Sequence, residues 1–551
     1  MNSDQAIAFP VLEPHHIEAL KNYGHSRSAS PGEVLWEEGD RSFCFFVVLS
    51  GLVEIVEHSG GEQRLIALHK PGEFTGDVDM LTGRASLVTG RVIEQAELLE
   101  IGAGSLQRVV GELPEVSEIV LKAFLTRRTL LLSDGYTGLK IIGSRFSPPA
   151  HHLREFATRN AIPFTWIDLE KDEQAEELLR QFGVGPNDTP IVICSSGSAI
   201  SNPSVSELAH HMGLDVYVAP GEIYDLVIVG AGPAGLAAAV YAASEGLKTL
   251  SVDGVAAGGQ AGTSSKIENY LGFPVGISGA ELARNALLQA QKFGARISVP
   301  QQAVGIRCTG GERTVLLDDG SEISARCILI ASGVEYKSLE IPEFERYEGA
   351  GIYYAATEME ARICSEEDAV IIGGGNSAGQ AAIFLSRSSR QVHVVIRGDD
   401  LGKSMSRYLV DRVEGTPNIH VHKRHTVAHL DGGDQLSEVV LRDEESGSMR
   451  RLPARAMFMF IGAVPRTDWL RGCVDLDPKG FVLTGSSLPA ATLQNEVWGA
   501  VKRPPYFLET SLPGVFAAGD ARSDSVKRVA SAVGEGSMAI SFVHAHIGAP
   551  G

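Results

Sequence analysis

The stretch 225-DLVIVGAGPAGLAAAVYAASEGLKTLSVD-253 decides the fold of the larger part of this chain. An apolar strand runs into a glycine-rich turn, an alanine-rich helix follows, and a second strand ends at an acid. In such a turn the first glycine permits tight bending, the second lets backbone approach a pyrophosphate, and the third lets the helix pack on the strand. The carboxylate at the end of the second strand is placed to accept a hydrogen bond from a ribose hydroxyl. The stretch therefore predicts a dinucleotide-binding α/β domain. Its predicted binding residues are Gly230, Gly232, Pro233, Ala234, Gly235 and Asp253.

A second glycine-rich turn follows the apolar strand AVII at 369–372 and opens another helix. Its next strand, QVHVVI, ends in Arg397 instead of an acid. Arginine attracts a 2′-phosphate that a carboxylate would repel, so the second nucleotide is expected to be NADPH. Lys403 is a second candidate cation for that phosphate, and the alternative that Arg397 is a solvated loop residue stays open. The predicted binding residues of the turn itself are Gly373, Gly375, Asn376, Ser377 and Ala378.

Composition excludes several classes of function. The length of 551 residues predicts about three or four domains. A net charge of −20, from 48 basic and 68 acidic residues, argues against general binding to nucleic acid or anionic membranes. The sequence shows no apolar run of membrane-spanning length and no secretion signal. Six irregularly spaced cysteines without a C-x-x-C predict no metal site, and they fit a reducing cytoplasm.

The first 220 residues differ in pattern from the rest. Short apolar runs separated by glycine turns over 10–110 predict a β jelly roll, and 114–132 predicts a helix. Residues 138–218 alternate strand and helix three times, which predicts a small α/β domain.

Residues 222–551 resemble the low-molecular-weight thioredoxin reductases, flavoproteins of the pyridine nucleotide-disulfide oxidoreductase class. The matching motifs occur in order. They are GAGPAG (230–235), GGQAG (258–262), ENYLGFP (268–274), ILIASG (328–333), GGGNSAGQAA (373–382), MFIGAVP (459–465), GVFAAGDAR (514–522) and KRVASAVGEG (527–536). The resemblance implies an FAD-dependent NAD(P)H oxidoreductase with FAD and NADPH as cofactors. It places these further residues around FAD: Gly258, Gly259, Gln260, Asn269, Gly519, Asp520, Lys527, Arg528 and Val529.

The chain departs from that family where the redox cysteine pair belongs. The corresponding positions, 355–359, read Ala-Ala-Thr-Glu-Met, and Cys364 is a single thiol that we expect to be structural. We therefore expect no internal redox dithiol. Glu358 or Glu360 is a candidate proton donor near the flavin, with ordinary helix surface charge as the alternative. Tyr353 and Tyr354 are expected either to cover a flavin face or to pack in the core.

The two front domains resemble known families as well. The stretch 72-GEFTGDVDMLTGRASLVTGR-91 resembles the phosphate-binding cassette of cyclic-nucleotide-binding domains. In it Asp77 would grip the ribose and Arg84 the cyclic phosphate, and a charged surface loop is the alternative. Residues 138–218 resemble thioredoxin or glutaredoxin-like domains, with Thr189-Pro190 at the position of the cis-proline. Their active-site position reads RFSPPAHH and has no C-x-x-C, so we expect a docking or spacer domain.

The predicted fold class is therefore multidomain, with a β jelly roll, a thioredoxin-like α/β domain and two Rossmann-like α/β domains. The expected boundaries are 1–135 for the first, 136–220 for the second, 221–348 with 455–551 for the FAD domain, and 349–454 for the NAD(P)H domain. By resemblance, the last two domains rotate about hinges near Gly349–Gly351 and 455.

Two classes of function stay open. The first is a flavin oxidoreductase whose electron acceptor is a small molecule or a protein, such as ferredoxin, a quinone or another protein's disulfide. The second is a redox or ligand sensor with a cyclic nucleotide as effector. A DNA-binding regulator is disfavoured because the sequence has no helix-turn-helix pattern and no basic face. We expect a cytoplasmic homodimer that binds neither nucleic acid nor membrane.

Overall fold

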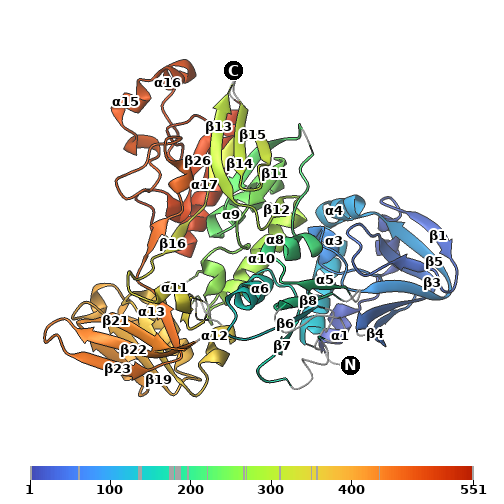
Figure 1. The fold of residues 1–551 in the computed structure, drawn as a ribbon. Helices are drawn as coiled ribbons and strands as arrows, with labels where there is room; N and C mark the ends of the chain where they lie inside the picture. Colours follow the sequence, from blue (N-terminus) through green and yellow to red (C-terminus); the bar gives the residue numbers. More distant parts are fainter. Residues whose placement is uncertain are drawn as a thin grey trace.

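The computed structural model describes residues 3–59, 62–133, 139–172, 179, 188–194, 198–219, 221–264, 267, 270–309, 312–348, 350–354, 356, 358–433 and 435–548. Figure 1 shows a β-rich domain at one side, a large α/β domain above, a second α/β domain at the opposite side, and a small α/β domain between them. No helix in these residues is long and apolar enough to cross a membrane.

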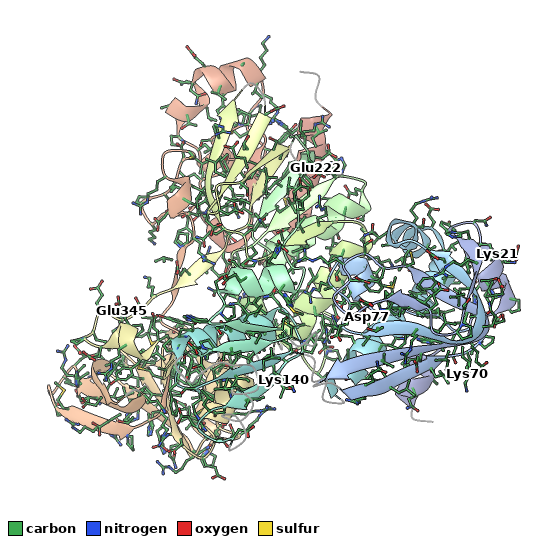
Figure 2. The ribbon with its side chains drawn as sticks, turned by 45° about the vertical axis from the view of Figure 1, so that its right-hand side comes forward. Lys21, Lys70, Asp77, Lys140, Glu222 and Glu345 are labelled. Carbon is green, nitrogen blue, oxygen red and sulfur yellow. The ribbon has the colours of Figure 1, made fainter. Side chains whose placement is uncertain are left out.

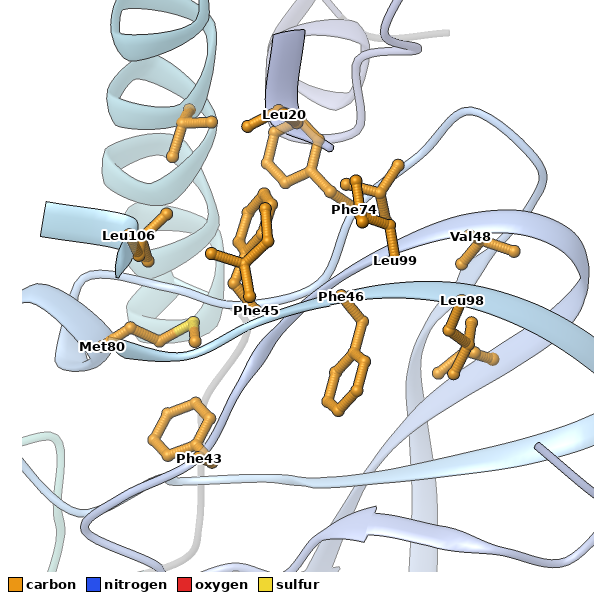
Figure 3. Packing of buried hydrophobic residues seen from close by; sticks show 14 of the residues in the cluster. Leu20, Phe43, Phe45, Phe46, Val48, Phe74, Met80, Leu98, Leu99 and Leu106 are labelled. Carbon is orange, nitrogen blue, oxygen red and sulfur yellow. The ribbon is translucent and has the colours of Figure 1, made fainter. Parts of the chain in front are cut away.

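The front domain is an antiparallel sheet covered by helices. The strands lie in the order β1 (His25–Ala29), β5 (Thr89–Ile101), β3 (Phe45–Ser59) and β4 (Glu62–His69), and β2 (Val34–Trp36) pairs with β5. The helices are α1 (Ser3–Ala8), α2 (Pro14–Leu20), α3 (Asp79–Thr82), α4 (Ala103–Glu112) and α5 (Pro114–Ser133). Figure 3 shows Phe45, Phe46 and Phe74 packed inside this domain. The β-rich domain and the helix expected over 114–132 are confirmed.

The side chain of Arg127 in α5 connects separate segments of this domain. Its guanidinium donates to the carbonyl oxygens of Ala8 (2.8 Å), Phe74 (2.9 Å) and Gly76 (2.6 Å). It also lies over the rings of three phenylalanines, with Phe74 nearest at 4.8 Å. Burial lowers the pKa of Arg127 to about 9, so the side chain stays charged at neutral pH. The residue therefore holds the start of the chain and the cassette segment after β4 against α5.

The small domain is a four-stranded mixed sheet. Its order is β7 (Thr165–Asp168), β6 (Lys140–Gly143), β8 (Ile191–Ile193) and β9 (Ala199–Ser201). Strands β6 and β7 are parallel, the pairs β6–β8 and β8–β9 are antiparallel, and the bond Thr189-Pro190 is cis. The described helices are α6 (Pro148–Arg159) and α8 (Val205–His211). The helix expected over 174–183 lies outside the described residues, apart from Leu179.

The largest sheet contains the first glycine turn. Its order is β12 (Arg296–Ser298), β11 (Thr249–Val252), β10 (Ile223–Val229), β15 (Glu322–Ile330), β14 (Glu312–Leu317) and β13 (Ala303–Thr309), with β26 (Val515–Ala517) paired to β15. Helices α9 (Pro233–Ser244), α10 (Gly279–Lys292) and α17 (Val529–Ile547) pack on it. The strand, turn, helix and strand expected over 225–253 are all present.

The second nucleotide domain has a parallel sheet of its own. Its order is β17 (Ile352–Tyr353), β24 (Ala456–Met459), β18 (Asp368–Ile372), β19 (Gln391–Ile396) and β20 (Ile419–Lys423). The antiparallel strands β21 (His425–Gly432), β22 (Leu436–Asp443) and β23 (Met449–Pro453) flank it. The helices include α11 (Phe344–Tyr347), α12 (Glu358–Ile363), α13 (Asn376–Leu385) and α14 (Arg407–Gly415).

One expected boundary is wrong. The sequence predicted that this domain ends at 454. In the structure β24 lies between β17 and β18, so the domain continues through Met459. The two connections between this domain and the large α/β domain are β16 (Val334–Tyr336), on the way in, and β25 (Ala463–Pro465), on the way back. These two strands pair with each other. The apolar run AMFMF carried no signal that assigns it to one of two neighbouring sheets, because buried parallel strands look alike.

We predict that Arg127→Met destabilises the front domain. The substitution removes three hydrogen bonds from a charged donor and leaves three carbonyls without that partner, a loss on the order of 3 kcal/mol or more. Calorimetry of the full chain should show the first unfolding transition lowered by roughly 10 °C. Arg108→Met, which removes an exposed cation paired with Glu112, is the control and should shift the transition by less than about 2 °C. Equal shifts for the two variants would contradict the role of Arg127.

Candidate functional site

Two of the three glycines in the first turn, Gly230 and Gly235, leave no room for a side chain. Gly230 has φ +111°, and a Cβ there would lie 2.2 Å from the carbonyl oxygen of Ala331. A Cβ on Gly235 would lie 1.8 Å from the oxygen of Gly230, which explains the close approach of helix to strand. Gly232 differs, because its Cβ would meet only the Cα of Gly259, at 3.8 Å. A crevice therefore lies beside Gly232 at the amino end of α9, with room for a ligand pyrophosphate.

Asp253 orders the loop that faces this turn. Its carboxylate accepts hydrogen bonds from the backbone N–H groups of Ala231 (2.9 Å), Val255 (2.9 Å) and Ala256 (3.2 Å). These bonds join the end of β11 to the turn after β10. The expected ribose acid therefore holds the two loops in place while it borders the same cavity.

A cavity of about 640 Å³ opens from this crevice. It is bordered by the first turn, the loop after β11, the second turn, the segment around Gly519 and helix α6. The predicted residues that line it are Gly232, Pro233, Ala234, Asp253, Gly259, Gln260, Glu360, Ser377, Gly519, Asp520, Lys527, Arg528 and Val529. Since Ser377 lines it together with Gly232, both nucleotide turns face one space. The size and the glycine-lined wall fit a dinucleotide such as FAD.

The wall near the C-terminus is held by a carboxylate that the sequence analysis did not single out. Glu535 of α17 accepts from the N–H of Gly519 (2.8 Å) and from Arg522 (2.6 Å). Burial raises the pKa of Asp520, and Lys527 donates to the Asp520 carbonyl at 2.6 Å. The turn η6 (Gly519–Ala521) thus presents its backbone to the cavity in a fixed geometry.

The second turn repeats the same construction. Gly373 has φ +136°, and the Asn376 side chain accepts from the N–H of Ser406 at 2.7 Å. Arg397 lies exposed just after β19, which fits both a contact with a 2′-phosphate and the alternative of a solvated loop residue, so its role stays a prediction. Lys403 is also exposed, but its amine is paired with Asp399 at 2.6 Å. Gly375 and Ala378 lie at the start of α13. The remaining predicted residue of the first domain, Gly258, lies beside Gly259 in the loop after β11.

Helix α6 of the small domain closes the cavity from the other side. Arg159 donates to the carbonyl of Gly259 at 3.2 Å, and the Asn160 amide donates to the carbonyl of Val255 at 3.2 Å. These two bonds fasten the end of α6 to the loop that Asp253 organises. In Figure 1, α6 lies in the middle of the molecule, next to α12. Sequence reasoning missed this contact because a helix surface carries no sign of what it meets in another domain.

The start of α6 brings a histidine into the cavity. The side chain of His151 is only 7% exposed, and its ring centroid lies 5.4 Å from that of Tyr353. Burial lowers the pKa of His151 to about 4, so the ring is neutral at pH 7. Burial likewise raises the pKa of Tyr353, and the charge of Glu360 raises it further. Both rings line the cavity.

Two residues that follow positions 355–359 can be placed, Glu360 and Cys364. Glu360 is 4% exposed in α12, and its charge stabilises the guanidinium of Arg154 in α6. Cys364 is fully buried, and its thiol donates to the carbonyl of Glu360 at 3.2 Å. The side chain of Glu358 and the whole of Asn269 lie outside the described residues, so both stay predictions.

The candidate cyclic-nucleotide residues of the front domain belong to a charged cluster. Asp77 accepts from the N–H of Asp79 (2.9 Å), and Arg128 lies 3.8 Å from Asp77 and contacts Asp79. Arg84 is close to the same carboxylates, and it donates to the carbonyl of Asn160 at 2.9 Å. Figure 2 shows Asp77 on the side of the front domain that faces the rest of the molecule. Arg84 therefore connects the front domain to the end of α6.

Comparisons with known proteins agree with this geometry. A model of the pyridine nucleotide-disulphide oxidoreductase family matches residues 224–536, and one of the cyclic nucleotide-binding domain matches 26–112. The thioredoxin reductase of Streptomyces clavuligerus is 32% identical over 319 residues, covering 58% of this chain and 92% of that protein. A bifunctional thioredoxin reductase/thioredoxin of Mycobacterium leprae is 31% identical over 318 residues, covering 58% and 64%.

Solved structures give the same result. The thioredoxin reductase of Lactococcus lactis in its FR conformation has a TM-score of 0.52 and 26% identity, covering 59% of this chain and 99% of that one. The thioredoxin reductase of T. acidophilum has a TM-score of 0.52 and 29% identity with the same coverage.

We predict that Gly232→Val yields a folded protein that has lost its flavin. Because a Cβ at Gly232 meets no protein atom closer than 3.8 Å, the new side chain fits the fold and fills only the crevice. Flavin absorbance per chain should fall at least about tenfold, which corresponds to 1.4 kcal/mol or more, while circular dichroism stays unchanged. Gly499→Val, at an exposed glycine with no atom near its Cβ, is the control and should keep its flavin. A Gly232→Val protein that keeps its flavin and is yellow would contradict the assignment of this turn to the cofactor site.

Proposed function

Because this chain belongs to the pyridine nucleotide-disulphide oxidoreductase family, we propose that it passes electrons from NADPH through FAD to an acceptor without an internal redox dithiol. The observation that carries the proposal is the shared cavity, which both nucleotide turns face and which no cysteine lines among the described residues. The sequence positions 355–359 contain no cysteine either.

FAD and NADPH are the cofactors of the thioredoxin reductase-like family. FAD, when bound, supplies hydride acceptance from NADPH and onward transfer of two electrons. The chain contributes a backbone cradle at Gly232 and Gly259, the ordered loop at Asp253 and the fixed turn at Gly519. For the second nucleotide it contributes the turn at Gly373–Ala378 and the exposed cation Arg397. These groups bind and orient, and none of them is consumed.

A reduction through thiols is disfavoured by the surroundings of the nearest cysteine. Thiol–disulfide exchange needs an accessible thiolate and a second thiol to resolve the mixed disulfide. Cys364 is 0% exposed, and burial raises the pKa of its thiol. Its neighbours are the hydroxyl of Ser389 and backbone carbonyls, not another thiol. Electrons therefore leave the cofactor directly, to a small molecule or to a protein that carries its own redox group.

The small domain is proposed to be thioredoxin-like. Its strand order β7-β6-β8-β9, with β6 and β7 parallel, and the cis bond before β8 support this assignment. Without a C-x-x-C it cannot exchange disulfides, and its α6 docks on the cofactor loop instead. The domain is thus a docked part of the enzyme. The homodimer and the cytoplasmic location expected from the sequence are kept as parts of the same proposal.

A second candidate function is control by a cyclic nucleotide bound to the front domain. The favouring observation is a hydrogen-bonded path from Arg84 to the carbonyl of Asn160, and from the Asn160 amide to the carbonyl of Val255. Val255 follows Asp253, whose carboxylate accepts the N–H of Val255. A phosphate that captured Arg84 would withdraw it from Asn160 and so act on the cofactor loop.

We predict that the enzyme accepts two electrons per FAD. Anaerobic titration should reach full reduction at two electrons, not four, because no dithiol can store a second pair, and no long-wavelength thiolate-to-flavin band should appear. Cys364→Ala should leave NADPH-dependent reduction of artificial acceptors within about twofold, since the thiol is buried away from the cavity. Uptake of four electrons, or loss of activity in Cys364→Ala, would show that this thiol takes part.

The regulatory function predicts a signal in the flavin when cyclic AMP or cyclic GMP is added. The nucleotide should bind in calorimetry and change the flavin fluorescence of the full chain, because Arg84 and the cofactor loop are linked. Arg84→Gln should weaken the binding at least about tenfold through loss of a charge-assisted phosphate contact. Arg41→Gln, a neighbouring interface cation paired with Asp215, should not. If calorimetry shows no heat of binding at millimolar nucleotide, the regulatory function is wrong and Arg84 serves only the contact between the front domain and Asn160.

A further inference from the structure

Among the cavity residues, His151 stands apart. It is more than nine-tenths buried, yet neither ring nitrogen has a hydrogen-bond partner in the protein among the residues that the structure describes. Neither nitrogen is among the fully buried polar atoms that lack a partner, so both are accessible from the cavity that the ring lines. A molecule bound in the cavity can therefore reach a donor and an acceptor on this ring, in place of water.

The surroundings of this ring describe that molecule. The rings of His151 and Tyr353 are in contact, with centroids 5.4 Å apart and planes inclined by 47°, and Tyr354 also lines the cavity. Aromatic side chains contact a flat, conjugated ring by their faces or their edges. A neutral imidazole carries one N–H donor and one free acceptor nitrogen, so it pairs with a carbonyl oxygen. The charge of the neighbouring acid Glu360 acts on the guanidinium of Arg154.

The place of His151 in the fold matters as much as its chemistry. It comes from the first turn of α6, at the RFSPPAHH segment of the small domain. Tyr353 lies two residues before positions 355–359 of the nicotinamide domain, a stretch whose sequence contains no cysteine. The acceptor end of the cavity is therefore built from two domains. A disulfide acceptor would need a thiolate there, whereas a carbonyl acceptor needs only a hydride and a proton.

We propose that His151 is a catalytic proton donor to a quinone-type acceptor that binds between α6 and Tyr353. This inference rests on the proposed NADPH and FAD chemistry and names the class of its acceptor. The overall reaction balances: NADPH, a proton and the quinone give NADP⁺ and the hydroquinone. Two electrons and one proton originate as the hydride of NADPH. The second proton passes through His151: a proton from solvent enters the acceptor nitrogen of the ring as the N–H on the other nitrogen passes to the quinone oxygen, so the ring ends neutral.

The test compares two oxidants of the NADPH-reduced enzyme in stopped flow, a 1,4-naphthoquinone and ferricyanide. Ferricyanide takes electrons without protons, so it reports the same reduced enzyme without the proposed step. His151→Phe keeps the aromatic contact with Tyr353 but cannot donate a proton. Its quinone rate should fall by about a hundredfold, within the range of general acid catalysis. Its ferricyanide rate should stay within about twofold of the parent.

Binding provides a readout that does not depend on turnover. Naphthoquinone should quench the flavin fluorescence of the oxidised parent protein, and His151→Phe should raise the Kd about fivefold or more through loss of a hydrogen bond. His151→Gln keeps a donor without an acid, so it should recover much of the affinity and little of the rate. Imidazole in the buffer should partly restore the quinone rate of His151→Ala.

The outcomes separate the two levels of the proposal. If NADPH does not reduce the flavin in the parent protein, the proposed function fails before His151 is tested. If quinone and ferricyanide rates fall together in His151→Phe, the residue is structural and the inference is wrong. An unchanged quinone rate and an unchanged Kd would overturn it as well.

Discussion

Two hydrogen bonds at the end of α6 determine how this molecule is assembled. Arg159 and Asn160 donate to the carbonyls of Gly259 and Val255, on the loop that the carboxylate of Asp253 also organises. Each such bond contributes only about 0.5–1.5 kcal/mol net. Their importance is positional, because they fasten a helix from one domain to the cofactor loop of another. The front domain reaches the same joint through Arg84.

The contact between α6 and the cofactor loop also determines which side chains line the cavity. His151, from the active-site position of the small domain, and Tyr353 and Glu360, which flank positions 355–359, line the same cavity. The rings of His151 and Tyr353, one from each domain, are in contact there. Among the described residues, the cavity that the nucleotide turns face is lined by imidazole and phenol groups and by no thiol. We propose that this site serves hydride and proton transfer to a small acceptor.

The sequence predicts the local elements well and the contacts between domains poorly. The strand QVHVVI is β19 to the residue, and the glycines at 230, 232 and 235 each have the steric reason that the motif requires. Such features depend on neighbouring residues, so a short window contains the information. The contact between His151 and Tyr353 joins residues about two hundred positions apart, and the end of the second domain at Met459 depends on which sheet accepts β24. Neither leaves a periodic trace in the sequence.

The central claim is that α6 and the cofactor cradle form one structural unit. Hydrogen–deuterium exchange of the full chain, measured with FAD and after its removal, tests this most directly. If the hydrogen bonds of Arg159 and Asn160 couple them, loss of FAD should raise exchange in 148–160 together with 230–235 and 253–259. Helix α14, which lies outside the cavity, should stay unchanged. Faster exchange confined to the glycine turn and the loop after β11, with α6 as protected as before, would contradict the claim.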